Sequence, residues 1–266
     1  MGYGFEKYIL GADGGVINTK IIDVNFDFTN DTPGYWKNFW EKDDILGGGE
    51  NDPDTASKML QSYHQKLWSK PLPNGEILSL SAGSGSNYLT WRNFRFGSDS
   101  LIASFRYRRY RNMLQKVADL VPDYKLFIEV FLRKSYTVGG TIIFPKENSI
   151  NRERGCNPFI KDRWDLTLEC IRRYYNGETS PLFETLKKNK EFFSLFVDFR
   201  GYVDFFHLQD CVTKDYKSVV FWIGEGEFDG KPLPKTPEEY IQWMDKQLDF
   251  LVKRNERIRI SLENAE

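Results

Sequence analysis

Residues 151–175, Asn-Arg-Glu-Arg-Gly-Cys-Asn-Pro-Phe-Ile-Lys-Asp-Arg-Trp-Asp-Leu-Thr-Leu-Glu-Cys-Ile-Arg-Arg-Tyr-Tyr, combine a polar segment with a charged helix. From Trp164 onward, large apolar residues recur at i, i+4, i+7 and i+11, which predicts a helix over 162–176 with one buried stripe. The segment before it, which contains Asn, Arg and Gly, is expected to be a loop. Charged side chains fall beside the stripe. Because ionised groups are costly to bury unless they are paired or used, this region is the main candidate for a functional site.

The segments on either side of this helix predict many helices and a few strands. Helical periodicity and capping residues indicate helices at 35–46, 52–69, 101–120, from there to Lys134, and at 181–188, 190–198, 202–212 and 236–259. Alternating or β-branched runs indicate strands at 20–28, 77–80, 88–91, 141–144 and 217–223. We therefore predict an α+β fold, predominantly helical with a small β-sheet.

The chain shows no internal repeat and no clear linker. We expect a single globular domain over 1–266, with a β-containing N-terminal half (about 1–145) and a helical C-terminal half (about 146–266).

Composition excludes several functional classes. The net charge is −1, so any contact with nucleic acid must come from a local basic patch. Three cysteines without a C-x-x-C pair, together with only two histidines, argue against a metal site. The same unpaired cysteines favour a reducing, cytoplasmic location. No run of 18 apolar residues occurs, so no membrane span is expected. The aromatic share of 16% is high and is interpreted mainly as core.

The charges in and before the 162–176 helix are candidates for binding an anion, because guanidinium groups and helix N-termini both bind phosphate or carboxylate. The predicted anion-binding residues are Arg152, Arg154, Arg163, Arg172, Arg173 and Lys70. Glu169 and His64 are the candidate catalytic residues, since both side chains transfer protons. The alternative is that the charges form i,i+4 ion pairs on a solvated face and that His64 is structural.

A second basic segment, Ser104–Met113, interleaves arginines with aromatic residues. One interpretation is an amphipathic helix with a basic exposed side. The other is a nucleic-acid patch formed by Arg106, Arg108, Arg109 and Arg111.

Short motifs spread along the chain also suggest a family. They are Asp27-Phe28 with Asp31-Thr32-Pro33-Gly34, Tyr63-His64, Leu67-Trp68-Ser69-Lys70, Leu72-Pro73-Asn74-Gly75, Ser98-Asp99-Ser100, Ile142-Ile143-Phe144-Pro145, Ile150-Asn151 with Arg154-Gly155, Asp162-Arg163 with residues 165–175, Asp198-Phe199 with Gly201-Tyr202-Val203, and Arg254-Asn255. Together they resemble a bacterial family of uncharacterised proteins, a domain of unknown function, over nearly the whole chain. The resemblance implies no activity. The chain departs from the family pattern at Trp164, where Phe is usual, and in the arginine-rich stretch 106–111.

Three hypotheses about function follow. The first is a cytosolic bacterial protein directed at a nucleotide or nucleic acid, with an Arg/Glu anion-binding cleft. The second is a non-enzymatic interaction protein, with a protein partner or a second copy of itself, whose charges form a structural network. The third is transfer of ADP-ribose from NAD, because a Tyr-His pair, a Ser-rich strand and a distant Glu are similar to that arrangement. The sequence leaves open whether the protein is an enzyme and identifies no cofactor.

Overall fold

The structure is a computed structural model that describes residues 22–32, 34–35, 52–83, 88–102, 111–226, 228, 230 and 232–264. Most of the helix expected at 35–46 lies outside these ranges, as does the first part of the one expected at 101–120. None of the helices in the described ranges combines the length and the apolar character that crossing a bilayer requires.

A small antiparallel sheet has its strands in the order β1-β2-β3-β4, with β1 exposed at one edge. The strands are β1 (Ser81–Ala82), β2 (Leu89–Trp91), β3 (Phe94–Ser100) and β4 (Thr141–Pro145). β4 is buried along its whole length, and β3 pairs with it so that Ser98 faces Ile143 and Asp99 faces Ile142. This sheet among many helices confirms the α+β prediction.

Three of the expected strands are absent from the residues that the structure describes. Residues 20–28 were expected to alternate as a strand, yet Phe28–Asp31 form a 3-10 helix, η2, because the Asp27 carboxylate accepts the Thr29 N–H at 2.9 Å. Such a local side-chain bond competes with strand pairing. The segments at 77–80 and 217–223 make only single bridges, Pro71 with Ile77 and Val212 with Val219.

The described helices are α2 (Pro53–Ala56), α3 (Lys58–Trp68), α4 (Arg111–Leu120), α5 (Tyr124–Ser135), α6 (Ile150–Cys156), α7 (Trp164–Tyr175), α8 (Phe183–Lys188), α9 (Lys190–Ser194), α10 (Phe199–Phe205) and α11 (Pro237–Glu263), with short 3-10 turns η4 (Val138–Gly140) and η5 (Gln209–Cys211). The helix predicted at 52–69 is present but divided at Ser57, whose hydroxyl caps α3 by accepting the Leu60 N–H. The prediction of a loop before α7 is wrong in part, because Ile150–Cys156 form the helix α6. Ile150 and Arg154, one helical turn apart, are both buried on it.

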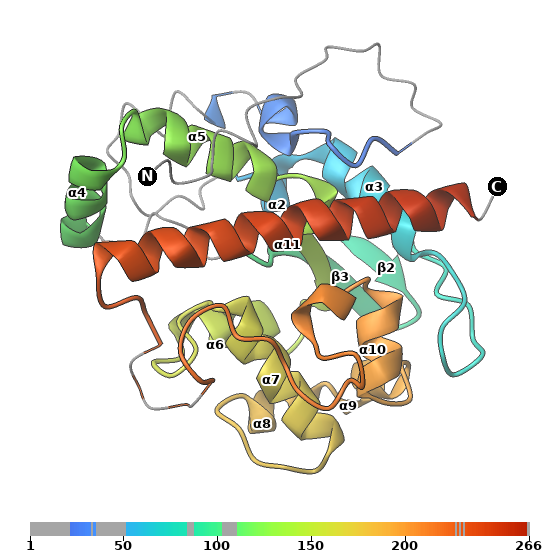
Figure 1. The fold of residues 1–266 in the computed structure, drawn as a ribbon. Helices are drawn as coiled ribbons and strands as arrows, with labels where there is room; N and C mark the ends of the chain where they lie inside the picture. Colours follow the sequence, from blue (N-terminus) through green and yellow to red (C-terminus); the bar gives the residue numbers. More distant parts are fainter. Residues whose placement is uncertain are drawn as a thin grey trace.

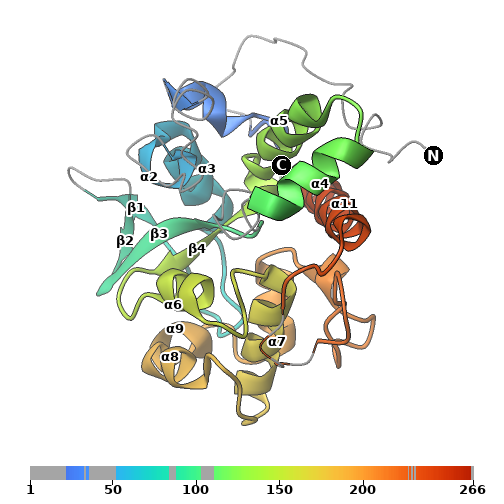
Figure 2. The same ribbon diagram turned by 90° about the vertical axis from the view of Figure 1, so that its left-hand side faces the viewer.

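The layers of the molecule are clear in the two ribbon views. α11 runs across the middle, with α4 and α5 on one side and α6 to α10 on the other (Figure 1). α2 and α3 lie over one face of the sheet, and α6 lies under the other (Figure 2). The N-terminal Thr236 cap and Pro237 predicted for α11 are both in place. Apolar side chains from all these layers form one continuous core cluster.

The η4 turn connects α5, β4 and α11 through two adjacent glycines. Asn255 of α11 accepts the Gly139 N–H at 2.7 Å and donates to the Thr137 hydroxyl at 2.9 Å. A Cβ added at Gly139 would meet the Asn255 Oδ1 atom at 2.4 Å, and one added at Gly140 would meet the Ser135 carbonyl oxygen at 1.8 Å. Only residues without a side chain fit between these backbones.

We expect Gly140→Ala to lower the free energy of unfolding by more than about 2 kcal/mol, because the backbone of α5 must move to admit a methyl group. Gly177→Ala is the matched control. Gly177 also lies in a turn, with φ +71 and no atom within 4 Å of an added Cβ, so it should lose only about 1 kcal/mol from its left-handed backbone. Urea denaturation measures both variants, and equal losses would contradict the close contact at Gly140.

Candidate functional site

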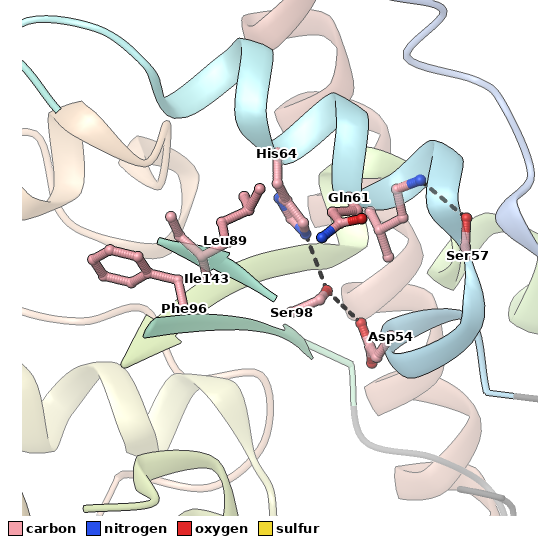
Figure 3. A pocket seen from close by; sticks show the side chains of 9 residues that line it. Asp54, Ser57, Gln61, His64, Leu89, Phe96, Ser98 and Ile143 are labelled. Atoms are coloured by element: carbon pink, nitrogen blue, oxygen red, sulfur yellow. Dashed lines mark hydrogen bonds between the residues drawn. The ribbon is translucent and has the colours of Figure 1, made fainter. Parts of the chain in front are cut away.

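A chain of side-chain hydrogen bonds joins α3, β3 and α2. Trp68 Nε1 donates to His64 Nδ1 at 2.9 Å, and His64 Nε2 lies 3.0 Å from Ser98 Oγ. Ser98 Oγ donates in turn to Asp54 Oδ1 at 2.6 Å. Figure 3 shows Asp54, Ser98 and His64 in line, with the His64 ring pointing from α3 toward β3. Trp68 and His64 are one helical turn apart, so both side chains lie on the same face of α3.

The direction of this chain follows from its first member. The indole N–H of Trp68 can only donate, so His64 Nδ1 must be the unprotonated nitrogen and Nε2 carries the proton. Burial, with a contribution from the charge of Arg254, lowers the pKa of His64 to about 3, so the ring is neutral near pH 7. His64 therefore donates to Ser98. It cannot act as the base that takes the proton of Ser98, which goes to Asp54 instead.

Asp54 is the chemically unusual end of the chain. Burial, and then repulsion from Asp52 and Asp99, raises the pKa of its carboxyl group well above the ordinary value of 3.8. Burial also raises the pKa of Asp99, although the neighbouring guanidinium of Arg154 opposes the shift. Two neighbouring carboxyl groups with raised pKa values are typical of sites that transfer protons.

Asp54, Ser98 and Asp99 lie at the base of a cleft with a volume of about 580 Å³. This volume is in the range of pockets that hold small molecules. The remaining wall consists of Thr55, Gly97, Phe144, Pro145, Lys146, Ser149, Asn151 and Arg152. Next to it, a cavity of about 10 Å³ is bounded by Asp54, Gln61, His64 and Ser98 on its polar side and by Leu89, Phe96 and Ile143 on its apolar side (Figure 3). That cavity has the size of one water molecule.

The rim of the cleft is basic. Arg152 and Lys146 are both exposed, and neither forms an ion pair with another described residue. Lys146 extends over the ring of Tyr88 at 5.7 Å. Between them, Asn148 and Ser149 have positive φ angles of 62° and 41°. Backbone strain of this kind is concentrated at functional sites. The cleft thus combines an acidic base with free cationic groups at its entrance.

Arg154, predicted to bind an anion, lies fully buried behind the cleft. Its Nη1 atom donates to Asp99 Oδ2 and to the carbonyl oxygen of Ser100, both at 2.7 Å, and Nη2 donates to the carbonyl oxygen of Asp162 at 3.2 Å. The Arg154 side chain therefore holds the carboxylate of Asp99 in place at the base of the cleft. Arg152, from the same predicted set, is the member that reaches the cleft itself.

Arg163 is placed in a separate buried cluster. It binds Asp165 through two bonds, of 3.0 and 2.5 Å, and donates to the carbonyl oxygens of Pro232 and Ile223. Asp165, which is completely buried, also accepts the Trp222 N–H at 2.9 Å. These bonds fasten the segment before α11 to the start of α7.

Glu169 is engaged by two arginines of its own helix. Arg172 binds both carboxylate oxygens at 2.8 and 2.9 Å, and Arg173 donates to Oε1 at 2.8 Å. These are the i,i+3 and i,i+4 pairs that one interpretation of the sequence expected. None of these three residues is among those that line the Asp54 cleft.

The other predicted residues lie elsewhere. Lys70 follows α3 and contacts α10 and His207, away from the cleft. Of the predicted nucleic-acid patch, Arg106, Arg108 and Arg109 lie outside the described residues, and Arg111 is the first residue of α4. Within the described ranges, no three His, Cys, Asp or Glu side chains gather as metal ligands would.

Sequence reasoning did not select Asp54, Ser98, Asp99 or Lys146 as site residues. Asp54 was interpreted only as part of a helix start, and Ser98 lies in β3, in a stretch for which the sequence predicted no strand. Asp54 and Ser98 are 44 residues apart, and His64 and Ser98 are 34 apart. Two signals were available: an Asp-Pro-Asp motif, which capping explains equally well, and the Ser98-Asp99-Ser100 family motif, to which no role was assigned.

We expect Asp54→Asn to gain stability relative to the wild type as the pH rises. The folded-state pKa of Asp54 lies above its unfolded value, so the carboxyl group favours folding below the unfolded pKa and loses that contribution as the pH rises through the folded pKa. The asparagine oxygen still accepts the Ser98 proton but carries no charge. Urea denaturation from about pH 4 to about pH 8 measures the difference, and a constant difference would contradict the raised pKa.

A family model described as a family of unknown function, DUF6994, matches residues 22–258. Neither a curated protein nor a solved structure matches the chain. Because the family match extends over nearly the whole sequence and includes the described cleft, the protein belongs to the DUF6994 family, whose function is unknown.

Proposed function

We propose that this protein is an enzyme that binds a nucleotide-sized anion in the Asp54 cleft and transfers a proton through Asp54. The observation that carries the proposal is the directed chain from Trp68 through His64 and Ser98 to Asp54, which ends in a cleft of about 580 Å³. A carboxyl group with a raised pKa binds a proton more readily than an ordinary aspartate, which suits it to accept and return protons.

The cationic rim supports an anionic ligand. The guanidinium of Arg152 has five N–H donors, and the ammonium group of Lys146 adds a second positive charge to the lining of the cleft. Phosphate groups are the common ligands of such pairs. We therefore place the phosphates of a nucleotide at Arg152 and Lys146 and its reacting bond near Asp54. The one-water cavity beside Asp54 supports a hydrolytic reaction, in which the carboxylate removes a proton from water.

We further propose a bacterial cytoplasmic protein, in keeping with three free thiols, at Cys156, Cys170 and Cys211.

A thermal-shift screen against ATP, AMP, NAD and short RNA and DNA tests ligand binding. We expect a nucleotide to raise the melting midpoint of the wild type and Arg152→Ala to lose most of that shift. Lys187→Ala, which removes an exposed lysine outside the cleft, is the matched control and should keep the shift. Equal shifts in both variants would place the ligand elsewhere. Consumption of NAD in a separate chromatographic assay would favour the transfer of ADP-ribose.

A second proposal, an interaction protein with a structural charge network, is favoured by the pairing on α7. Glu169 is bound by two arginines, and the Arg163–Asp165 pair holds backbone groups rather than facing the cleft. In this proposal no small molecule binds, and the protein associates with a partner or with itself. Sedimentation of the purified protein together with the ligand screen separates the two proposals.

A further inference from the structure

A second groove of the molecule is formed by α7, α8 and α9 and is separate from the Asp54 cleft. These three helices lie together on one side of α11 (Figure 1), and the groove has a volume of about 580 Å³. This volume is in the range of pockets that hold small molecules. None of the residues that line the groove also lines the cleft. The groove can therefore hold a ligand of its own.

The wall of this groove, which we call the α7–α9 groove, is aromatic. Tyr174, Tyr175, Phe183 and Phe193 all line it. The centroid of the Tyr174 ring lies 5.3 Å from that of Phe193 and 6.3 Å from that of Phe183. The Tyr175 hydroxyl donates to the carbonyl oxygen of Phe193 at 2.7 Å, which fixes the position of its ring. Rings held in this way offer a surface on which an aromatic ligand can pack edge-on or offset.

The rim of the groove carries more positive than negative charge. Lys187 of α8 and Lys190 of α9 line it and are exposed, and so is Glu191. None of these three side chains forms an ion pair with another residue that the structure describes. Two amines and one carboxylate leave a small positive excess. That excess complements a ligand with one negative charge, whereas Glu191 would repel the more highly charged phosphates of a nucleotide.

Val197, which also lines the groove, has an unusual backbone conformation. Its φ angle is 69°, in the left-handed region that β-branched residues rarely adopt, and the residue is 62% exposed. Asn adopts the same region at a lower cost. The Val197 side chain therefore presents apolar surface to the groove from a strained position, as is common where a ligand is held.

We propose that the α7–α9 groove binds a small aromatic monocarboxylate. The ring of the ligand packs against Tyr174 and Phe193, and its carboxylate pairs with the amino groups of Lys187 and Lys190. The apolar contacts supply most of the affinity, and the charge-assisted hydrogen bonds orient the ligand. Binding in this groove is independent of the proposed function at Asp54.

Isothermal titration of the full-length protein with indole-3-acetate tests the proposal. We expect saturable binding at one site. Indole-3-acetamide has the same ring but no charge, so it should bind at least about tenfold more weakly. Either an absence of saturable binding of indole-3-acetate or equal affinities for the acid and the amide would overturn the proposal.

Four variants locate the site. Lys187→Ala and Lys190→Ala should each weaken the binding of indole-3-acetate at least about fivefold. Lys188→Ala is the matched control, because it removes an exposed lysine of α8 that does not line the groove, and it should bind as the wild type does. Val197→Asn should bind more weakly although its backbone is less strained. Unchanged affinity in both Lys187→Ala and Lys190→Ala would show that the ligand lies elsewhere and would overturn the proposal.

Discussion

Replacing Arg254 by alanine is expected to lower the free energy of unfolding by more than about 3 kcal/mol. The guanidinium is fully buried and donates to the carbonyl oxygens of Phe206, Gly139 and Thr141, at 3.1, 2.7 and 2.8 Å. These carbonyls belong to the residue that follows α10, to η4 and to β4, so one side chain of α11 joins three parts of the fold. Without Arg254, three buried acceptors lose their donors and a large cavity remains.

Two further variants give this prediction its control. Arg254→Lys keeps a cation but loses the fork of donors, so it should restore only part of the lost stability. Arg257→Ala removes a neighbouring arginine of the same helix whose pair with Asp210 is partly exposed, and it should cost less than about 1 kcal/mol. Urea denaturation measures all three variants. An Arg254→Ala protein as stable as Arg257→Ala would show that the carbonyl groups find other donors.

Asp165→Ala is expected to cost about 3–5 kcal/mol, because it leaves the guanidinium of Arg163 buried without its counter-ion. It also removes the acceptor of the Trp222 N–H. Ile223 and Pro232, which Arg163 holds through their carbonyl oxygens, should loosen as a result. Hydrogen exchange at residues 222–226 would detect that loosening.

A double variant distinguishes a structural pair from an anion site. Arg163→Met with Asp165→Leu removes both charges and should be more stable than Asp165→Ala, since no charge is left without a partner. Asp249→Ala removes an exposed i,i+4 partner of Lys253 and should change stability little. If Asp165→Ala were as stable as the wild type, the Arg163–Asp165 pair would not carry the structural role assigned to it.

The helices that the sequence predicted best are those with both periodicity and caps. In α7, Trp164, Leu168 and Ile171 are all buried as their spacing indicated, and α11 begins at the predicted Thr-Pro motif. In the described part of 20–28 no strand forms, because the hydrogen bond from the Thr29 N–H to Asp27 competes with strand pairing. Alternation of apolar and polar residues does not reveal such a local bond. Short strands such as β3 depend on partners distant in sequence, so periodicity alone does not reveal them.

The candidate site depends even more on contacts between residues that are distant in sequence. His64 was selected from the sequence, but its partners Ser98 and Asp54 come from other elements and only the fold brings them together. The sequence also did not show which of the predicted arginines are exposed and which are buried. Arg152 and Arg154 lie two residues apart on α6, yet one is exposed at the cleft and the other is fully buried against Asp99. Their separation on the helix surface, not their chemistry, decides which one can meet a ligand.

The most direct test of the central claim, that Asp54 transfers a proton in the cleft, is a chromatographic assay of nucleotide consumption by the wild type and Asp54→Asn. Each protein is incubated with ATP, AMP and NAD in turn, and Arg152→Ala and Lys187→Ala run beside them. The account predicts that the wild type and Lys187→Ala form product and that Asp54→Asn still shows the thermal shift of a bound nucleotide but loses at least about 100-fold in rate. Undiminished product formation by folded Asp54→Asn, or no consumption of any nucleotide by the wild type, would contradict it.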